Sequence, residues 1–224
     1  MSAEIWIVTL PDAAAPDVRA WAALSDAEQA RADRFRHPAD RAAYVHGHAA
    51  LRALIERRLD RPLQRRPFDR RQSGKPWLAG SPIGFSYSRS RQRAAVALVD
   101  GGDVGVDIEA IVPDETSAGV ARANFPASDI TWIMQAGGDP DRLRRFYRLW
   151  VIREAVLKAG GEGLTRPLAS VAIEIDGDTL ELIGDTRWTA VESPPIDGYA
   201  AAAAIPRRCG VSWLDTRWSD LVTS

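Results

Sequence analysis

The spacing of apolar residues divides the first part of the chain into one strand, two helices and an irregular segment. Residues 4–10 alternate between apolar and polar side chains and end at Pro11, which predicts a strand. Residues 25–28 have the Ser-x-x-Glu pattern of a capping box and predict the start of a helix. A second, longer helix is expected over residues 40–59, and the Pro- and Arg-rich residues 61–80 predict irregular structure.

The rest of the chain consists of short apolar runs around one long helical segment. Strands are predicted at residues 84–87, 93–99 and 104–111, with a turn over residues 88–92. Short helices are expected at residues 120–125 and 129–136. Five further strands are predicted after the long helix, at residues 171–175, 179–183, 188–192, 199–205 and 211–214. Strands that follow helices in this order, without strict alternation, indicate the α+β class.

The long helical segment, residues 146–158, reads FYRLWVIREAVLK and is apolar on almost every side. A helix of this kind is usually buried. Glu154 and Lys158 nevertheless lie in it one turn apart, on the line through Phe146 and Trp150. The simplest interpretation is an ordinary i,i+4 ion pair. The alternative is that a buried carboxylate has a functional partner elsewhere in the fold.

The strand predicted over residues 104–111 places two carboxylates on one face. With a period of two, Asp107 and Glu109 point to the same side as Gly105. One interpretation is a solvated strand edge. The other is a pair of ligands for a cation, because like charges side by side are favourable only around a positive charge. Gly105 indicates a close backbone approach, which a solvated edge does not need.

Composition places the chain among globular proteins of a reducing compartment. It has 224 residues, 46% of them hydrophobic, and a formal net charge of -1. The single cysteine, Cys209, excludes an internal disulfide, so a cytoplasmic location is expected. The first residues, MSAEIWIVTLPD, are not expected to form a signal peptide, and the longest apolar runs are too short to span a membrane.

Charge is distributed unevenly, and lysine is rare. Residues 1–100 have an excess of basic side chains, and residues 101–224 an excess of acidic ones. This arrangement suits a ligand that carries both phosphates and a metal, although chance could also produce it. Of the 29 basic residues only Lys75 and Lys158 are lysines. Because lysine is a compact charge and arginine a rigid fork, both lysines are candidates for specific functions.

These residues together predict a metal-assisted phosphate site. Asp107, Glu109 and Glu154 are hard oxygen ligands that favour Mg²⁺ over zinc. Candidate phosphate partners come from the basic half: Lys75, Arg89, Arg31, Arg41 and Arg52. His46 and His48 are two residues apart and point to different sides of a helix, so we interpret them as ordinary polar positions. No P-loop, dinucleotide fingerprint, GxSxG or HExxH motif is present.

The order of motifs resembles the 4′-phosphopantetheinyl transferases. The chain has GKP at residues 74–76, F-x-x-S-x-S at 85–90, GVDIE at 105–109, W-x-x-x-E-x-x-x-K at 150–158 and GLxxPL at 163–168. Each motif alone is weak, but five in order over most of the chain form a strong signal. The length and the pair Arg34-Phe35 resemble the long, surfactin-synthetase-activator type.

The resemblance implies a pseudo-dimer of two similar α+β halves, residues 1–104 and 105–224, with a cleft between them. Coenzyme A and Mg²⁺ would bind there, and an apo acyl or peptidyl carrier protein would be the partner. Nucleic acid and membranes are not expected as partners, and a pseudo-dimer is expected to be a monomer. Asp107, Glu109 and Glu154 would be metal ligands, and Glu154 and Lys158 would be catalytic. Coenzyme A would be held by a larger set: Lys75, Ser88, Arg89, Asp107, Lys158, Arg31, Arg41 and Arg52.

Three positions depart from the family pattern. Arg89 replaces a histidine, Glu28 stands where a lysine can occur, and Ala43 stands where some members have an arginine. Arginine can bind a phosphate but does not titrate near neutral pH. Two other functions stay open: a metal-dependent phosphohydrolase that uses the same carboxylates, and a non-catalytic protein that binds coenzyme A or carrier domains, in which Arg89 marks lost chemistry. The identity of the carrier is also open.

Overall fold

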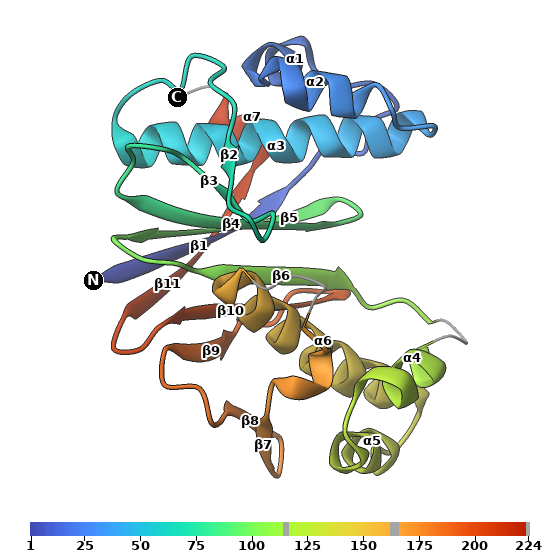
Figure 1. Ribbon diagram of the computed structural model, residues 1–224. Coiled ribbons are helices and arrows are strands. Elements are labelled where there is room, and N and C mark those ends of the chain that lie inside the picture. Colours follow the sequence, from blue (N-terminus) through green and yellow to red (C-terminus); the bar gives the residue numbers. More distant parts are fainter. Residues whose placement is uncertain (114–116, 162–165, 223–224) are drawn as a thin grey trace.

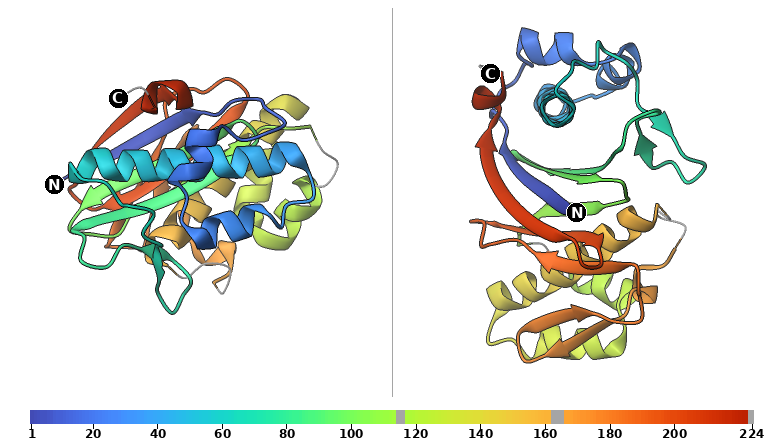
Figure 2. Two further views of the ribbon diagram at one scale, coloured as in Figure 1. Left: turned by 90° about the horizontal axis from the view of Figure 1, so that it is seen from above. Right: turned by 90° about the vertical axis from the view of Figure 1, so that its left-hand side faces the viewer.

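The computed structural model describes residues 1–113, 117–161 and 166–222. Two sheets lie face to face in the middle of the molecule, and a long helix covers the outer face of each (Figure 1). The layers are thus helix, sheet, sheet and helix, a mixed α+β architecture as predicted. The side view in Figure 2 shows the same stack turned by 90°.

The first sheet has the strand order β11-β1-β5-β4. Its strands are β1 (Ser2–Thr9), β4 (Ile83–Ser90), β5 (Arg93–Asp100) and β11 (Gly210–Arg217). β1 pairs antiparallel with β5 and parallel with β11. The helix α3 (Pro38–Leu59) packs on this sheet, with α1 (Val18–Ala23), α2 (Asp26–Ala32) and α7 (Trp218–Leu221) around it.

The second sheet has the order β6-β10-β9 and is covered by α6. Its strands are β6 (Gly105–Ala110), β9 (Trp188–Glu192) and β10 (Tyr199–Pro206). α6 runs over Asp139–Gly160, and the helices α4 (Ser117–Asn124) and α5 (Ala127–Met134) pack beside it. The 3-10 turn η2 (Leu168–Ser170) and the hairpin of β7 (Ile173–Asp176) and β8 (Thr179–Leu182) complete this layer.

A third apolar core lies between the two sheets. Ile5 and Ile7 of β1 meet Val106 and Ile108 of β6 there, and all four side chains are buried. The alanine run of β10 fits this position, because small residues let the sheet approach a neighbour on both faces. Alternate alanines face the middle core and the α6 core. The strand predicted at residues 199–205 is therefore confirmed as β10.

Most predicted elements are present with shifted ends. The capping box of α2 is formed, with Ser25 and Glu28 bonded reciprocally. β4 continues to Ser90, so the turn predicted over residues 88–92 is shorter than expected and has Arg91 in the left-handed region, at φ 50°. Sequence reasoning missed α1, α7 and the small strands β2 (Asp69–Arg70) and β3 (Pro76–Trp77).

The chain crosses between the layers more than once. β11 and α7 return to the first sheet, and Trp218 is buried in the core under α3. The two-half division at residues 104 and 105 stays a prediction, and these last elements pack with the first layer. Among the helices of the described ranges, none combines the length and apolar character needed to cross a bilayer.

Candidate active site at the junction of the two layers

α6 and β6 touch at backbone level where Gly105 lies. A Cβ atom at Gly105 would fall 1.8 Å from the carbonyl oxygen of Ala155 and 2.5 Å from the backbone nitrogen of Ala159. Only glycine allows this contact. The predicted close approach is confirmed. Because of this contact, the face of β6 that carries Asp107 and Glu109 lies against the side of α6 that carries Glu154 and Lys158.

An ion pair connects this strand to the helix. Lys158 Nζ lies 2.6 Å from Asp107 Oδ1 and 3.0 Å from Ser88 Oγ, and the Ser88 hydroxyl donates to the same Oδ1 at 2.7 Å. Asp107 is only 2% exposed. Its second oxygen, Oδ2, is buried and has no hydrogen-bond partner among the described residues. Oδ1 of this carboxylate thus accepts two hydrogen bonds, whereas Oδ2 is available to a cation.

Glu109 and Glu154 stand near this pair and are both partly buried. Burial raises the pKa of Glu154, the charge of Asp107 raises it further, and Lys158 opposes the rise. Burial also raises the pKa of Glu109, and the negative charges of Asp107 and Glu154 add to that rise. Asp107 therefore acts on both glutamates and Glu154 acts on Glu109, so the three carboxylates belong to one electrostatic neighbourhood.

The i,i+4 ion pair between Glu154 and Lys158 does not form. Lys158 pairs with Asp107, and within the described ranges no hydrogen bond or ion pair involves Glu154. Trp150, Glu154 and Lys158 are the half-exposed stripe of a helix whose other sides are mainly buried. Glu154 is therefore a carboxylate of raised pKa that is free to accept a proton or a cation.

The donor set matches the chemistry of a hard divalent cation. An orphaned buried oxygen of Asp107 and two carboxylates of raised pKa all gain from a positive charge between them. In residues 1–113, 117–161 and 166–222, however, no three His, Cys, Asp or Glu side chains are already gathered as a set of metal ligands. Glu109 and Glu154 are half-buried.

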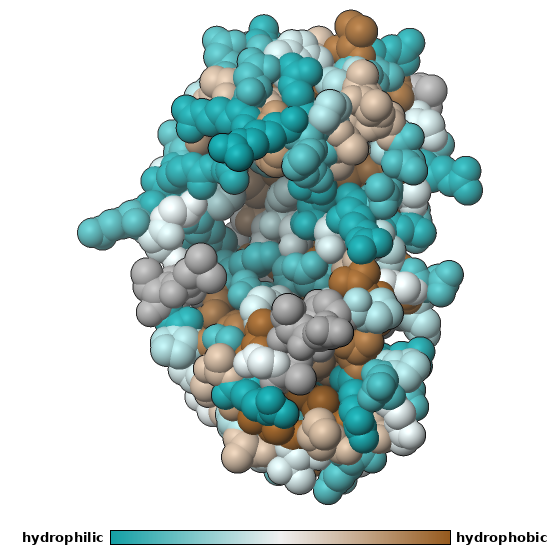
Figure 3. Space-filling model, turned by 90° about the vertical axis from the view of Figure 1, so that its right-hand side faces the viewer, coloured by the Kyte–Doolittle hydropathy of each residue, from teal (hydrophilic) through white to brown (hydrophobic). Residues whose placement is uncertain are grey.

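A groove with arginine and aromatic side chains in its lining lies beside this cluster in the first layer. It has a volume of about 460 Å³ and is lined by residues of α2, α3, β4 and the connecting segment, including Arg31, Arg70, Ser88 and Arg89. The surface is hollowed between the two layers (Figure 3). Arg31 is exposed and stacks over the Tyr44 ring, 5.7 Å from its centre. Arg70 was missed by sequence reasoning, because nothing in the irregular segment marks it.

Lys75 links the two layers. Its Nζ donates to the carbonyl oxygens of Ala159 at 2.8 Å and Val104 at 3.2 Å, and lies 3.2 Å from Asp103 Oδ1. Burial lowers the pKa of Lys75, and Asp103 opposes this effect. Lys75 also lines a cavity of about 280 Å³ that includes Lys158. In this conformation its ammonium already has three oxygen partners.

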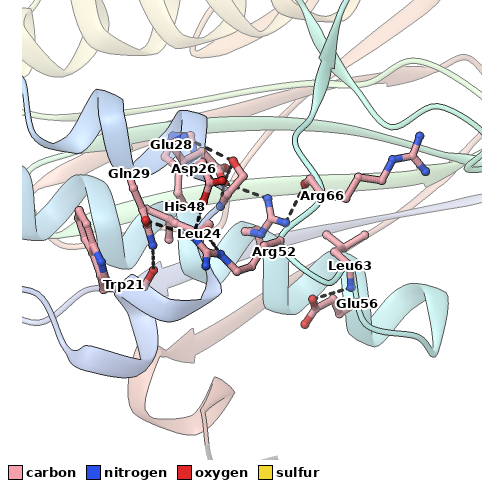
Figure 4. Close-up of polar contacts among 12 residues, drawn as sticks. Trp21, Leu24, Asp26, Glu28, Gln29, His48, Arg52, Glu56, Leu63 and Arg66 are labelled. Carbon is pink, nitrogen blue, oxygen red and sulfur yellow. Dashed lines mark hydrogen bonds and ion pairs between the residues drawn. The ribbon is translucent and has the colours of Figure 1, made fainter.

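Two of the predicted phosphate partners are not among the residues that line the groove. Arg52 is 1% exposed and donates to Glu28 Oε2 at 2.9 Å and to the carbonyl of Arg66 at 2.8 Å (Figure 4). Arg41 pairs with Asp33 at 2.8 Å and stacks on Trp21. Neither lines the groove. Arg52 is therefore a structural cation that neutralises a buried carboxylate, because its side chain is already enclosed and paired.

Glu28 is the centre of that network. It accepts bonds from Ser25 and Arg52, and His48 Nδ1 lies 3.0 Å from its Oε1 (Figure 4). Burial alone would raise the pKa of Glu28, but the bond to His48 and the charge of Arg52 outweigh it and lower the pKa. A carboxylate at the position where the family can carry a lysine is thus neutralised within the first layer.

The two histidines are ordinary polar positions, as interpreted from their spacing. His46 Nδ1 donates to the Ala42 carbonyl at 2.8 Å, and its Nε2 accepts the Asp17 N–H at 3.1 Å. This arrangement uses both ring nitrogens of a neutral imidazole. Of the GLxxPL motif, residues 163–165 lie outside the described ranges. Leu168 is buried in the core under α6.

Comparisons with known proteins agree with the motif pattern. Residues 103–204 match the model of the 4′-phosphopantetheinyl transferase superfamily. The chain is 28% identical over 221 residues to the 4′-phosphopantetheinyl transferase HetI of Nostoc sp. (strain PCC 7120), covering 96% of this chain and 90% of that protein. It is 28% identical over 200 residues to a putative 4′-phosphopantetheinyl transferase of Synechocystis sp. (strain PCC 6803), covering 86% and 80%.

A third relative is the 4′-phosphopantetheinyl transferase Sfp of Bacillus subtilis (strain 168), 26% identical over 156 residues, which covers 69% of this chain and 68% of Sfp. The matched region, residues 103–204, contains Asp107, Glu109, Glu154 and Lys158. It spans both β6 and α6, the two elements that meet at Gly105. These matches place the chain in the enzyme class of the 4′-phosphopantetheinyl transferases.

Proposed function

We propose that the protein transfers the 4′-phosphopantetheine group of coenzyme A to a serine of an apo acyl or peptidyl carrier protein, with Mg²⁺, and releases 3′,5′-ADP. The observation that carries this proposal is the cluster of Lys158, Asp107 and Ser88. This cluster joins one buried carboxylate to one ammonium, with Glu109 and Glu154 nearby, at the edge of a groove lined in part by arginines.

Asp107, Glu109 and Glu154 would hold the magnesium ion. Their support is the orphaned Oδ2 of Asp107 and the raised pKa values of both glutamates. When bound, the ion would neutralise the diphosphate of coenzyme A and the charge that grows on the leaving phosphate. Water and phosphate oxygens would supply the remaining ligands.

The groove would bind the nucleotide end of coenzyme A. Arg31, Arg70 and Arg89 supply its positive charge, and Ser88 links the groove to Asp107. Lys158 would face the diphosphate and stabilise negative charge on it during transfer. Lys75 would act mainly by holding the first layer to the second, since its ammonium bonds the backbone carbonyls of Ala159 in α6 and of Val104 directly before β6.

Glu154 would accept the proton of the attacking serine. The carrier hydroxyl oxygen attacks the β-phosphorus, its proton passes to Glu154 directly or through a water, and the bond from phosphorus to the oxygen of 3′,5′-ADP breaks. The leaving group departs with the electron pair of that bond. The half-exposed position of Glu154 and its freedom from ion pairs within the described residues support this role.

Finer points of the proposal follow the motif resemblance. The chain would be of the long, surfactin-synthetase-activator type and would act as a monomer in the cytoplasm. The alignment with Sfp over 69% of this chain supports the type. The pairing of two helix-covered sheets supports the pseudo-dimer, because both layers have the same order of helix and sheet around a shared core.

Intact mass measurement tests the proposal. The protein is incubated with coenzyme A, Mg²⁺ and several apo carrier proteins, and each carrier is weighed. We expect the mass of one phosphopantetheine group on the carrier and an equal amount of 3′,5′-ADP. Unmodified carriers with coenzyme A split in the absence of carrier would instead indicate a phosphohydrolase. Tight binding of coenzyme A with no turnover would indicate a binding protein.

A further inference from the structure

His48 of α3 lines the groove of the first layer and has one ring nitrogen without a protein partner. Its Nδ1 lies 3.0 Å from Glu28 Oε1, and its side chain is 18% exposed. Its Nε2 has no hydrogen-bond partner among the described residues and is not fully enclosed. His46, by contrast, uses both of its ring nitrogens. The spacing of the two histidines argues against a shared metal ion, but it does not exclude a contact between His48 and a ligand.

Contacts with three side chains hold the imidazole ring of His48. Its centre lies 4.2 Å from the Tyr44 ring centre and 5.1 Å from that of Tyr87, and Glu28 bonds its Nδ1 (Figure 4). Burial opposes the ionisation of Glu28, but the bond to His48 and the charge of Arg52 outweigh it and lower the pKa of Glu28. An ionised carboxylate only accepts hydrogen bonds, so Nδ1 carries a proton and donates it. Nε2 is therefore the nitrogen that is left for a ligand.

The charges around this ring favour an anion. Arg52 Nη1 lies 2.9 Å from Glu28 Oε2 and neutralises that carboxylate. A proton on Nε2 would therefore add a positive charge that no carboxylate compensates, and a bound anion would compensate it. The titratable and charged groups around His48 come from four elements: Glu28 and Arg31 of α2, Tyr44 and Arg52 of α3, Arg70 of β2, and Tyr87 and Arg89 of β4.

We propose that His48 is a phosphate-binding residue of the groove, which takes up a proton as the nucleotide end of coenzyme A binds and donates Nε2–H to a phosphate oxygen. The inference rests on the proposed function, since it names a contact between the groove and its ligand. The proton comes from solvent and returns to it when the ligand leaves. Glu28 is the positioning residue, because it accepts Nδ1–H and keeps the ring from turning. Removing such a charge-assisted bond weakens binding by roughly tenfold.

Calorimetry with 3′,5′-ADP measures both the affinity and the proton uptake. The full chain is titrated at pH 7.0 in two buffers of different ionisation enthalpy, and the difference in heat gives the number of protons bound. We expect the wild type to take up about 0.5–1 proton more per ligand than His48→Gln, and to bind roughly tenfold tighter. Protons released by the ligand are the same for both proteins. His37→Gln is the control, because His37 is exposed at the start of α3 and does not line the groove, so this variant should behave as the wild type.

A wild type that binds 3′,5′-ADP without taking up a proton would overturn the inference, and this result needs no variant to fold. Equal proton uptake by the wild type and His48→Gln, or equal loss of uptake in His37→Gln and His48→Gln, would overturn it as well. Failure of the proposed function looks different. If the wild type modifies no carrier but the proton uptake still depends on His48, the phosphate contact is supported and the transferase proposal is not.

Discussion

At the scale of single residues, the site depends on carboxylates held in an unfavourable position. Glu154 lies on a half-exposed stripe of α6, and burial together with Asp107 raises its pKa above the ordinary value of 4.5. A group whose pKa is raised on folding makes the folded state less stable whenever it is ionised. Such a cost is characteristic of functional positions, where ionised groups await a substrate or a cation.

The first prediction concerns Glu154→Gln. Without a carboxylate to accept the proton or bind the cation, turnover should fall by at least about 100-fold. The melting temperature should rise by about 1–2 °C at pH 7.5, because glutamine has no negative charge for burial and Asp107 to disfavour. The gain should vanish as the pH falls through the raised folded pKa toward 4.5, because both states then bind the proton.

Enzyme kinetics and calorimetric scans at several pH values check this prediction. The two readouts are independent, since activity reports the role of Glu154 and stability reports its environment. A variant of near-normal turnover would remove Glu154 as both ligand and base. A lower melting temperature at neutral pH would mean that the ionised carboxylate stabilises the fold and that its pKa is not raised.

A second prediction separates two arginines that sequence reasoning could not separate. Arg31 lines the groove, whereas Arg41 is paired with Asp33 and stacked on Trp21. Losing one charge-assisted bond to a phosphate costs about 1.5 kcal/mol, or roughly tenfold. Arg31→Ala should therefore raise the KM for coenzyme A about tenfold with little change in kcat. Arg41→Ala should leave the KM within about twofold of the wild-type value.

Steady-state kinetics of both variants with coenzyme A as the varied substrate tests this prediction. Equal effects of the two substitutions on the KM would contradict the assignment of the groove to coenzyme A.

At the scale of secondary-structure elements, the contact between α6 and β6 places Asp107 beside Lys158. The third prediction is that Gly105→Ala destabilises the protein by about 2–3 kcal/mol, because the added methyl meets the Ala155 carbonyl at 1.8 Å. Gly119→Ala is the control. It lies in α4 with no atom within 4 Å of the new methyl, and alanine favours helix there, so it should be neutral or slightly stabilising. Denaturant unfolding measures both, and a stable Gly105→Ala variant would show that the two elements can separate.

Patterns local to one element could be predicted from the sequence, and contacts between elements mostly could not. The capping box at Ser25, the shared face of Asp107 and Glu109, and the close approach at Gly105 each follow from local geometry. Arg41 and Arg52 were predicted as phosphate partners because charge alone does not tell which way a helical side chain faces. The pairing of Lys158 with Asp107, not Glu154, joins residues 51 positions apart, which no helical period can reveal.

At the scale of the whole molecule, one core is shared by both layers. Ile5 and Ile7 of the first sheet pack against Val106 and Ile108 of the second, and β11 returns the chain to its first strand. The cluster of Ser88, Asp107 and Lys158 also contains residues of both layers, since Ser88 belongs to the first and Asp107 and Lys158 belong to the second. A site built in this way requires the layers to be held together, because opening either one exposes the apolar face of the other.

The last prediction follows from that shared core: the two layers unfold as one cooperative unit. Amides of Ile7 in β1 and of Leu149 and Ile152 in α6 are deep in different layers, so native-state hydrogen exchange should report the same opening free energy for both. Gly105→Ala disturbs only the second layer directly, yet it should lower both values by the same amount, since neither sheet is stable without its neighbour. If α6 amides become less protected while β1 amides do not, the layers unfold separately. In that case the cluster of Ser88, Asp107 and Lys158 would be assembled by docking of two independently stable halves.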